Sequence, residues 1–597
     1  MTISPLSSAI DAQPSLREMI GQKLMLDFRY FCETGDASNC RQPMTQLPPS
    51  LQKLLQKYQI GGVILFAENV QGTEQIVNLT KELQKSSQTP IFISIDQEGG
   101  RVARINRAEA TSFTGNMSIG ATYPQHGDKY ATEVATVIAK ELSSLGINVN
   151  FAPTVDVNAN PLNPVINVRS FGEDPNRVAK LGAAQVKAFE NRGVISALKH
   201  FPGHGDTQVD SHTGLPKVGH SLSQIKQRDL LPFAHIIQAQ QPGMVMTAHI
   251  QYPALDSNTI INSKGERMIR PATMSRAIMH KLLREEMDYQ GVTITDALDM
   301  AGISDFFTPI DAVVETFKAG VDIALMPIPV RTPSDIEKFE LFFDAILTAV
   351  SEGKLQQQEV ASSYHRIMRL KARIAKFQSS PTTAIAKATL GNPQHRQLEA
   401  ELALAAITNV KNDGLLPIKP KAGQHIHLIM PDRQKATAMK QALQQATSAS
   451  IKVTITSLQA YKPERAQRFI ADADVVISAH ASPQQSAAEI GGMDDVAELK
   501  SYELSKHAQP KALLKLMQYA HSHKKASIFI SLRAPYEISK YAQYNQAVLA
   551  SYAYNVDVTE KNDVRGPAYT ALANVILGNA EALGRLPVSI DMESLKK

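Results

Sequence analysis

The 597-residue sequence contains no tryptophan, only two cysteines and no apolar run that approaches the roughly 18 residues of a membrane span. Tryptophan offers the largest aromatic face, and surfaces that bind polysaccharides commonly use such faces, so its absence disfavours a platform of this kind. The formal net charge is only +5, and no block of lysine and arginine is interleaved with aromatic residues. We therefore expect neither a membrane-spanning segment nor a nucleic-acid partner.

The two cysteines, Cys32 and Cys40, lie in the polar stretch CETGDASNC. The N-terminal stretch MTISPLSSAIDAQPS lacks a basic start followed by an apolar core, so it does not resemble an export signal. We therefore expect a cytoplasmic protein with two unpaired thiols, because disulfides are rare in that compartment. The alternative is a small disulfide loop in a periplasmic or secreted protein whose signal has been removed.

The composition is that of an ordinary globular protein, with 43% apolar and 20% charged residues. The length allows two or three domains, and we expect two. The turn-forming sequences SSPTT and GNP predict a linker at 376–395. It would separate an N-terminal domain at 1–375 from a C-terminal domain at 396–597.

Short apolar segments alternate with helix-like stretches in the first 330 residues, as in a fold with buried parallel strands. Strands are expected at 23–28, 62–66, 91–95, 149–157, 194–198, 244–248, 292–295 and 322–326. Helical spacing occurs at 74–84, 129–145, 178–190, 222–239, 274–286 and 310–318. Eight alternations predict a TIM-like (β/α)8 barrel. A doubly wound open sheet is the alternative.

The C-terminal part shows a different alternation, which predicts a layered α/β sandwich rather than a second barrel. Its strands are expected at 426–430, 452–456, 475–478, 527–532 and 547–551. Its helices are expected at 434–446, 511–521 and 568–577.

Ionisable residues follow the predicted barrel strands, at the strand ends where barrel enzymes carry their active sites. Asp96 follows the third strand, His249 the sixth and Asp296 the seventh. The densest group is KHFPGHGDTQVDSH at 199–212, which we expect to be a loop springing from the end of the fifth strand. These groups are expected to converge at one rim.

Asp296 and the pair of Asp210 and His212 offer the two roles that acetal hydrolysis requires. Asp296 is a candidate to attack or stabilise the anomeric carbon; the alternative is a helix N-cap. His212 is a candidate to transfer the proton, with Asp210 fixing its tautomer. The alternative is a hydrogen bond that serves only the loop.

A metal site also deserves consideration, because the 199–212 segment contains five side chains that commonly bind metals. These are His200, His204, Asp206, Asp210 and His212. The glycines break helical spacing, and no HExxH arrangement is present. We therefore expect neither a metal nor another cofactor.

Together these motifs resemble glycoside hydrolase family 3, and specifically its β-N-acetylglucosaminidase branch in a two-domain form. The resemblance rests on KHFPGHGDTQVDSH, on DQEGGRVAR upstream of it and on TITDALDM downstream. A weaker likeness covers the C-terminal domain through ISLRAPYE and GRLPVSI. It implies a barrel followed by an α/β sandwich.

The resemblance also implies roles for individual residues. Asp296 would be the nucleophile that forms a covalent glycosyl-enzyme, with His212 as general acid/base and Asp210 as its partner. Sugar-binding positions would be Asp96, Arg104, Arg169, Lys199 and His200. Other branches of the family take a Glu from the C-terminal domain as the acid/base, so the complete DSH sequence favours the N-acetylglucosaminidase branch.

The expected activity is that of a retaining exo-β-N-acetylglucosaminidase, a β-N-acetylhexosaminidase. Its substrate would be a small oligosaccharide, from peptidoglycan fragments (muropeptides) or from chitin, and the enzyme would be a monomer or a homodimer. The alternatives are a family 3 β-glucosidase or xylosidase, and a carbohydrate-binding protein without catalysis.

Other polar residues receive supporting roles in this prediction. We expect the 199–212 loop or its neighbours to be oriented by His204, Asp206 and His249. We also expect the loop to move, so that His212 reaches the sugar when the loop closes. The glycines that would permit this movement are Gly203, Gly205 and Gly214. Glu489, in a polar loop of the C-terminal domain, is a weaker rival for the acid/base role.

Overall fold

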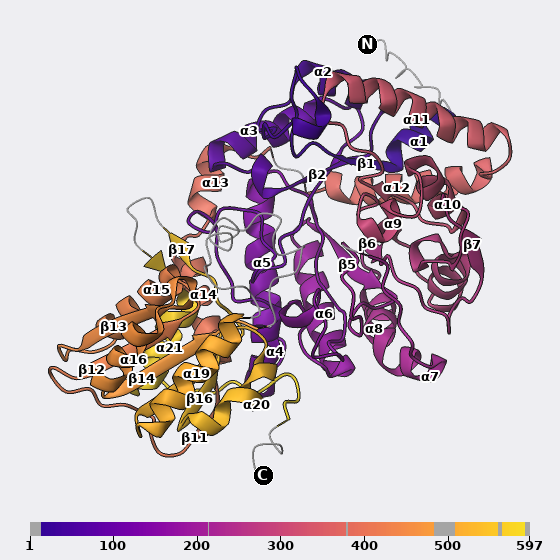
Figure 1. Cartoon of the computed structure of the whole chain (residues 1–597). Coiled ribbons are helices and arrows are strands. Elements are labelled where there is room, and N and C mark those ends of the chain that lie inside the picture. Colours follow the sequence, from indigo (N-terminus) through magenta and orange to yellow (C-terminus); the bar gives the residue numbers. More distant parts are fainter. Residues whose placement is uncertain (1–13, 213, 378–379, 483–507, 559–563, 592–597) are drawn as a thin grey trace, which may run out of the picture.

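The computed structural model describes residues 14–212, 214–377, 380–482, 508–558 and 564–591. The chain forms two lobes, an N-terminal barrel and a C-terminal α/β domain (Figure 1). The two lobes meet where α14 (Pro393–Ala406) packs against α4 (Asn116–His126) and α5 (Lys129–Ser144).

Eight parallel strands form the barrel in the order β10-β1-β2-β3-β4-β5-β6-β9. A parallel bridge between Ile294 and Ile323 links the two ends of this sheet, which favours the closed barrel over the open alternative. All eight predicted strands are present: β1 (Leu24–Asp27), β2 (Gly62–Leu65), β3 (Phe92–Ile95), β4 (Val149–Asn150), β5 (Ile195–Phe201), β6 (Met244–Thr247), β9 (Val292–Thr295) and β10 (Ala324–Leu325). The barrel prediction is therefore confirmed.

Helices surround the barrel and pack their apolar faces on the strands (Figure 1). They begin at strong local signals. Asp174 caps α6 by accepting hydrogen bonds from Asn176 N and Arg177 N, and Pro175 occupies the first turn. The main barrel helices are α1 (Leu16–Gln22), α2 (Pro49–Tyr58), α3 (Thr73–Lys85), α4, α5, α6 (Pro175–Glu190), α8 (Leu231–Gln240), the helical segment Ala277–Glu286, α10 (Pro309–Lys318), α11 (Pro333–Ser351) and α12 (Gln357–Ala375).

The C-terminal lobe is an α/β sandwich, as predicted, built on a six-stranded sheet of order β11-β16-β15-β14-β12-β13. Helices α15 (Arg433–Gln445) and α21 (Pro567–Leu577) cover one face, and α16 (Pro463–Asp472) and α19 (Ala508–Ser522) cover the other. The strands are β11 (Thr408–Asn412), β12 (His425–Met430), β13 (Lys452–Ser457), β14 (Val475–His480), β15 (Ala526–Ser531) and β16 (Ala547–Ala550). Only β11, which was not predicted, is antiparallel.

The segment 376–395, expected to be a linker, contains the helix α13 (Thr383–Thr389), which packs against α3 and α5. Beyond it, Glu399 of α14 accepts a hydrogen bond from Ser112 N (2.7 Å) and pairs with Arg565 (2.5 Å). The connection is thus itself packed on the barrel, and one buried carboxylate joins both lobes.

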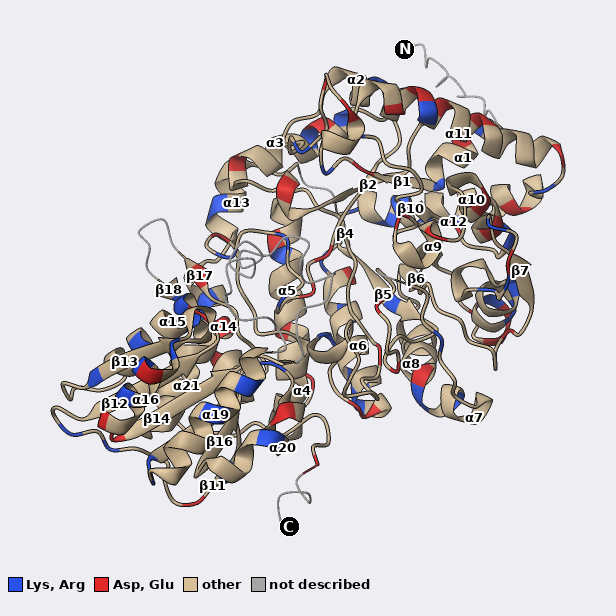
Figure 2. Ribbon diagram, viewed as in Figure 1, with Lys and Arg blue, Asp and Glu red and all other residues tan. Residues whose placement is uncertain are grey.

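Charged residues of both signs are interspersed along both lobes (Figure 2). Within the described residues, no helix combines the length and the apolar character needed to cross a membrane.

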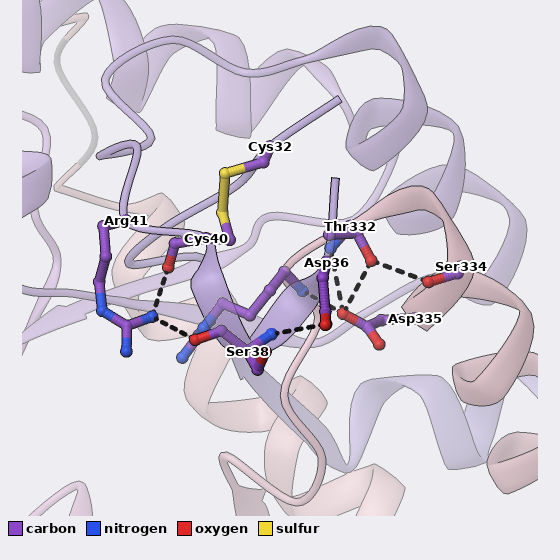
Figure 3. Close-up of a disulfide and its surroundings, with 9 residues drawn as sticks. Cys32, Asp36, Ser38, Cys40, Arg41, Thr332, Ser334 and Asp335 are labelled. Carbon is purple, nitrogen blue, oxygen red and sulfur yellow. Dashed lines mark hydrogen bonds between the residues drawn. A yellow bond between two sulfur atoms is a disulfide. The ribbon is translucent and has the colours of Figure 1, made fainter. Parts of the chain in front are cut away.

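Cys32 and Cys40 form a disulfide, so the prediction of two unpaired thiols is wrong (Figure 3). The short helical turn Ala37–Asn39 reverses the chain and brings the two Cα atoms to 5.8 Å. Asp36 accepts a hydrogen bond from Ser38 N, and Arg41 donates to the carbonyls of Ser38 and Cys40. Unpaired thiols were predicted because the N-terminal stretch does not resemble an export signal, whereas the turn that closes the disulfide is fixed by these local hydrogen bonds.

Replacing both cysteines with serine tests the disulfide. Closing a loop of this length stabilises a protein by about 2–3 kcal/mol in the chain-entropy model, so the double variant should show a lower Tm. Thiol titration of the unfolded, unreduced parent should find no free thiol. Two titratable thiols, or an unchanged Tm, would contradict the assignment.

Candidate active site

A cavity of about 400 Å³ opens at the C-terminal ends of the barrel strands. Seven of the eight predicted site residues line it, and the eighth, Asp210, is hydrogen-bonded to one of them. The seven are Asp96, Arg104, Arg169, Lys199, His200, His212 and Asp296. The structure therefore brings together residues that lie up to 200 positions apart in the sequence.

A buried carboxylate, Glu98, connects the cations of this cavity. Its Oε1 lies 2.7 Å from Arg169 Nη2 and 2.7 Å from Lys199 Nζ, and its Oε2 accepts from Arg169 Nε at 3.0 Å. Burial alone would raise the pKa of Glu98, but the charges and hydrogen bonds of Arg169 and Lys199 hold it well below its usual range. Glu98 therefore stays ionised and fixes both cations.

Asp96 lies at the edge of this ion network and faces the cavity. Its Oδ1 is 2.8 Å from Lys199 Nζ, and its Oδ2 is 3.5 Å from Arg104 Nη2. Although burial opposes it, the charges of Lys199 and Arg104 lower the pKa of Asp96. The result is a rigid, ionised acceptor beside two cationic donors, which suits the binding of sugar hydroxyls.

His200 is held by a second buried carboxylate, Asp156. His200 Nδ1 lies 2.7 Å from Asp156 Oδ2, while Asp156 Oδ1 accepts from His204 N at 2.6 Å. Strand β5 continues to Phe201, so Lys199 and His200 belong to the strand and not to a loop, which corrects the expectation. The strand residues of the motif are thus rigidly placed.

The rest of the motif, residues 202–212, is held in place by side-chain hydrogen bonds and ion pairs, within the segment and to residues that follow it. His204 contacts Thr207 Oγ1 (2.7 Å) through Nδ1 and Ser211 Oγ (3.1 Å) through Nε2. Asp206 pairs with His220, which in turn lies 2.8 Å from Asp229 through Nδ1. His204 and Asp206 therefore orient the loop.

The glycines of this segment provide close approach. A Cβ on Gly205 would lie 1.7 Å from Val157 O, and a Cβ on Gly203 would lie 3.1 Å from Asp229 Cβ. Gly205 is needed because its backbone nearly touches that of Val157, and Gly203 has a positive φ of 136° beside Asp229. The hinge role of these glycines stays a prediction. With the loop in this position, His212 already lines the cavity.

The candidate proton carrier, His212, and the candidate nucleophile, Asp296, both line this cavity. His212 Nδ1 is 2.7 Å from Asp210 Oδ1, which leaves Nε2 as the ring nitrogen available for proton exchange. The same Asp210 oxygen also accepts from His212 N, so the hydrogen bond organises the loop as well.

Asp296 follows β9 and is not a helix N-cap, since the next helix, α9 (Ala301–Ser304), begins five residues later. Its Oδ1 accepts from Ala297 N at 2.8 Å. Burial would raise the pKa of Asp296, but the nearby imidazoles of His200, His249 and His212 and this hydrogen bond lower it. Asp296 is therefore a carboxylate at neutral pH. His249 Nε2 lies 2.9 Å from Ala297 O and helps to hold this turn.

Four cavity or supporting residues were missed by the sequence analysis. Glu98 lies within DQEGGRVAR and Asp156 within the predicted fourth strand, where each was counted as part of its segment. Arg29 and Asp299 also line the cavity. Glu98, Arg29 and Asp299 all lie within four positions of the end of a barrel strand, and this proximity is the sequence signal that could have identified them.

The C-terminal domain supports the site from outside. Asn555 Nδ2 donates to Gly100 O (3.1 Å) and Phe113 O (3.3 Å), in the loop that follows Asp96 and Glu98. None of its described residues lines the cavity. Glu489, the rival acid/base, lies outside the described residues. Among the described residues, no group of three or more His, Cys, Asp or Glu is arranged to hold a metal ion.

Comparison with known families agrees with this architecture. Residues 15–370 match the glycosyl hydrolase family 3 N-terminal domain, and residues 407–595 match the family 3 C-terminal domain. The chain belongs to glycosyl hydrolase family 3. It is accordingly a glycoside hydrolase, and the cavity at the barrel mouth is its candidate active site.

Individual relatives within the family include β-hexosaminidases and a β-N-acetylglucosaminidase. The chain is 63% identical to β-hexosaminidase A of Pseudoalteromonas piscicida, over 96% of this chain and 97% of that protein. It is 35% identical to a β-hexosaminidase of Neisseria meningitidis over 45% of this chain and 71% of that protein. A family 3 β-N-acetylglucosaminidase from Paenibacillus sp. FPU-7 has a similar structure, with a TM-score of 0.76 and 27% identity over 96% of this chain and 99% of the other.

Replacing Glu98 with glutamine tests the ion network. The change leaves Lys199 and Arg169 with reduced compensation in a buried site, and we expect it to lower the free energy of unfolding by about 3–5 kcal/mol. Chemical unfolding would measure the loss. Glu340, an exposed partner of Lys57, provides the matched control, for which a glutamine should leave the free energy of unfolding nearly unchanged. Equal effects at the two positions would contradict a central role for Glu98.

Proposed function

We propose that the enzyme is a retaining exo-β-N-acetylglucosaminidase that removes terminal β-linked N-acetylglucosamine from small oligosaccharides. The observation that carries the proposal is the joint placement of Asp296 and the Asp210–His212 pair on one cavity. The names of its relatives, β-hexosaminidase and β-N-acetylglucosaminidase, support the same glycone.

In the first step, the Asp296 carboxylate attacks the anomeric carbon of the bound sugar. The glycosidic carbon–oxygen bond breaks as His212 Nε2 donates its proton to the leaving oxygen, and a covalent glycosyl-enzyme forms. Asp210 stabilises the imidazolium that precedes this transfer and fixes the tautomer that remains after it.

In the second step, neutral His212 accepts a proton from water, whose oxygen attacks the anomeric carbon. The bond to Asp296 breaks, and the sugar leaves with its original configuration. The lowered pKa of Asp296 suits both steps, because a carboxylate is the form that attacks and the form that leaves.

The ion network on the β3–β5 side of the cavity binds the substrate. Asp96 accepts hydrogen bonds from hydroxyl groups, while Lys199 and Arg104 donate them. A compact cavity that grips one terminal sugar in this way suits cleavage from the chain end. Chitooligosaccharides and peptidoglycan fragments both carry the required terminus.

The disulfide is relevant to the cellular location of the enzyme. Disulfides form and persist in oxidising compartments, so we propose a periplasmic or secreted location in place of the cytoplasmic one expected from the N-terminal sequence.

Initial rates on an aryl β-N-acetylglucosaminide and on the matching aryl β-glucoside test the activity. We expect the N-acetylglucosaminide to be the faster substrate, and turnover to fall by about 10³-fold or more in Asp296→Asn. His212→Ala should also slow turnover, most strongly with leaving groups that need a proton. A faster glucoside would favour the β-glucosidase alternative, and sugar binding without turnover would favour a binding protein.

A further inference from the structure

Two oppositely charged side chains on the cavity wall, Arg29 and Asp299, have no role in the chemistry described above. Both line the cavity. Within the described part of the chain, neither side chain makes a hydrogen bond or an ion pair, and the Arg29 Nε is buried without a partner. Each nevertheless lies close enough for the Arg29 charge to lower the pKa of Asp299.

Arg29 is held as a rigid donor. It follows β1, and its guanidinium lies 3.6 Å from the ring centre of Phe66 at the end of β2. The neighbouring Tyr30 hydroxyl donates to Glu68 at 3.0 Å, and the Cys32–Cys40 disulfide closes the segment just beyond. The one nearby carboxylate at the strand end, Asp27, is already paired with Arg331 at 2.7 Å.

Asp299 lies on the turn that follows Asp296, where its carboxyl group can accept hydrogen bonds. Its own carbonyl accepts from Ser304 Oγ at 3.0 Å, while its carboxyl group faces the cavity. The Asp299 side chain is exposed to solvent at the cavity. The surrounding protein and the charge of Asp27 raise the pKa of Asp299 to about 6, against the opposing charges of Arg29 and Arg331. Above this pH it is an unpaired carboxylate.

The position of this pair matches the side from which the leaving group departs. The loop that carries His212 crosses to the turn after Asp299, where Gly302 N donates to Ser211 O at 3.1 Å. A Cβ on Gly302 would lie 2.9 Å from Ser211 O, so the two segments are in close contact. Strand β1 lies on the opposite side of the barrel from β5, which carries Lys199 and His200. When the terminal sugar is bound on the β3–β5 side, the opposite side of the cavity, with Arg29 and Asp299, remains free to contact the next sugar unit.

We propose that Arg29 and Asp299 bind the leaving sugar, as specificity-determining residues for a neutral saccharide unit next to the scissile bond. The inference rests on the proposed function, since it assigns the group that His212 protonates. The Arg29 guanidinium donates to hydroxyl or acetamido oxygens of that unit, and the Asp299 carboxylate accepts from its hydroxyls.

The charges favour a neutral sugar over an acidic one. Hydroxyl groups both donate and accept, so one sugar unit satisfies a cation and a carboxylate that do not reach each other. A carboxylate on the leaving unit would gain from Arg29 but would be repelled by Asp299, while the paired charges of Asp27 and Arg331 offset each other.

The test compares two substrates that share the glycone and differ in the leaving group: an aryl β-N-acetylglucosaminide and the β-1,4-linked disaccharide of N-acetylglucosamine. The measured quantity is the ratio of kcat/KM on the disaccharide to kcat/KM on the aryl substrate. For Arg29→Met, which keeps packing on Phe66, we expect this ratio to fall about 10- to 100-fold, the loss typical of a hydrogen bond to a charged group. Asp299→Asn should lower it in the same direction.

Arg41→Gln is the matched control, because Arg41 donates only to carbonyls of the disulfide loop and does not line the cavity. It should leave the ratio unchanged, and Tm measurements should show that all three variants are folded. An unchanged ratio in Arg29→Met, or an equal fall in Arg41→Gln, would overturn the proposal.

Two further outcomes separate the parts of the argument. If the parent enzyme hydrolyses neither substrate, the proposed function itself is wrong. If Arg29→Met loses more on a disaccharide whose leaving unit carries a carboxylate than on the neutral one, Arg29 recognises an anion and the neutral-sugar assignment is overturned.

Discussion

The compensation of buried charge at the barrel mouth is the constraint on which the rest of the site depends. Two cations, Lys199 and Arg169, are almost fully enclosed and would be costly to bury alone. Glu98 pairs with both, and Asp96 adds a second negative charge from the cavity side. Because these groups fix one another, the proposed sugar-binding wall is formed before any ligand arrives. Such preorganisation is what electrostatic catalysis requires.

The two proposed catalytic residues are positioned at this wall in different ways. Asp296 lies on the turn after β9, and the surrounding imidazoles favour its ionised form. His212 stands on a loop, but that loop is fastened through His204 to the Asp156 that also holds His200. The C-terminal domain adds support through Asn555, which holds the loop after Glu98. Residues of both lobes therefore position the side chains of the cavity.

The fold and most of the site were predictable because their signals are local. Eight apolar segments marked the barrel strands, and the charged residues that follow them marked the rim. The edge strand β11 was missed because its sequence, TNVKN, is polar and half exposed. The disulfide was misjudged because the prediction relied on the compartment suggested by the N-terminal sequence and not on the turn around Asp36 and Arg41. Partnerships such as Glu98 with Lys199 join positions 101 residues apart, and nothing in either segment specifies the other.

The most direct test of this account is to locate the covalent intermediate. A fluorinated N-acetylglucosaminyl donor that forms the glycosyl-enzyme faster than water releases it would be incubated with the protein, and peptide mass spectrometry would identify the modified residue. The account predicts one added sugar on the peptide that contains Asp296, and no adduct in Asp296→Asn. An adduct on a different carboxylate, or turnover of the donor with no covalent species at any time, would contradict it.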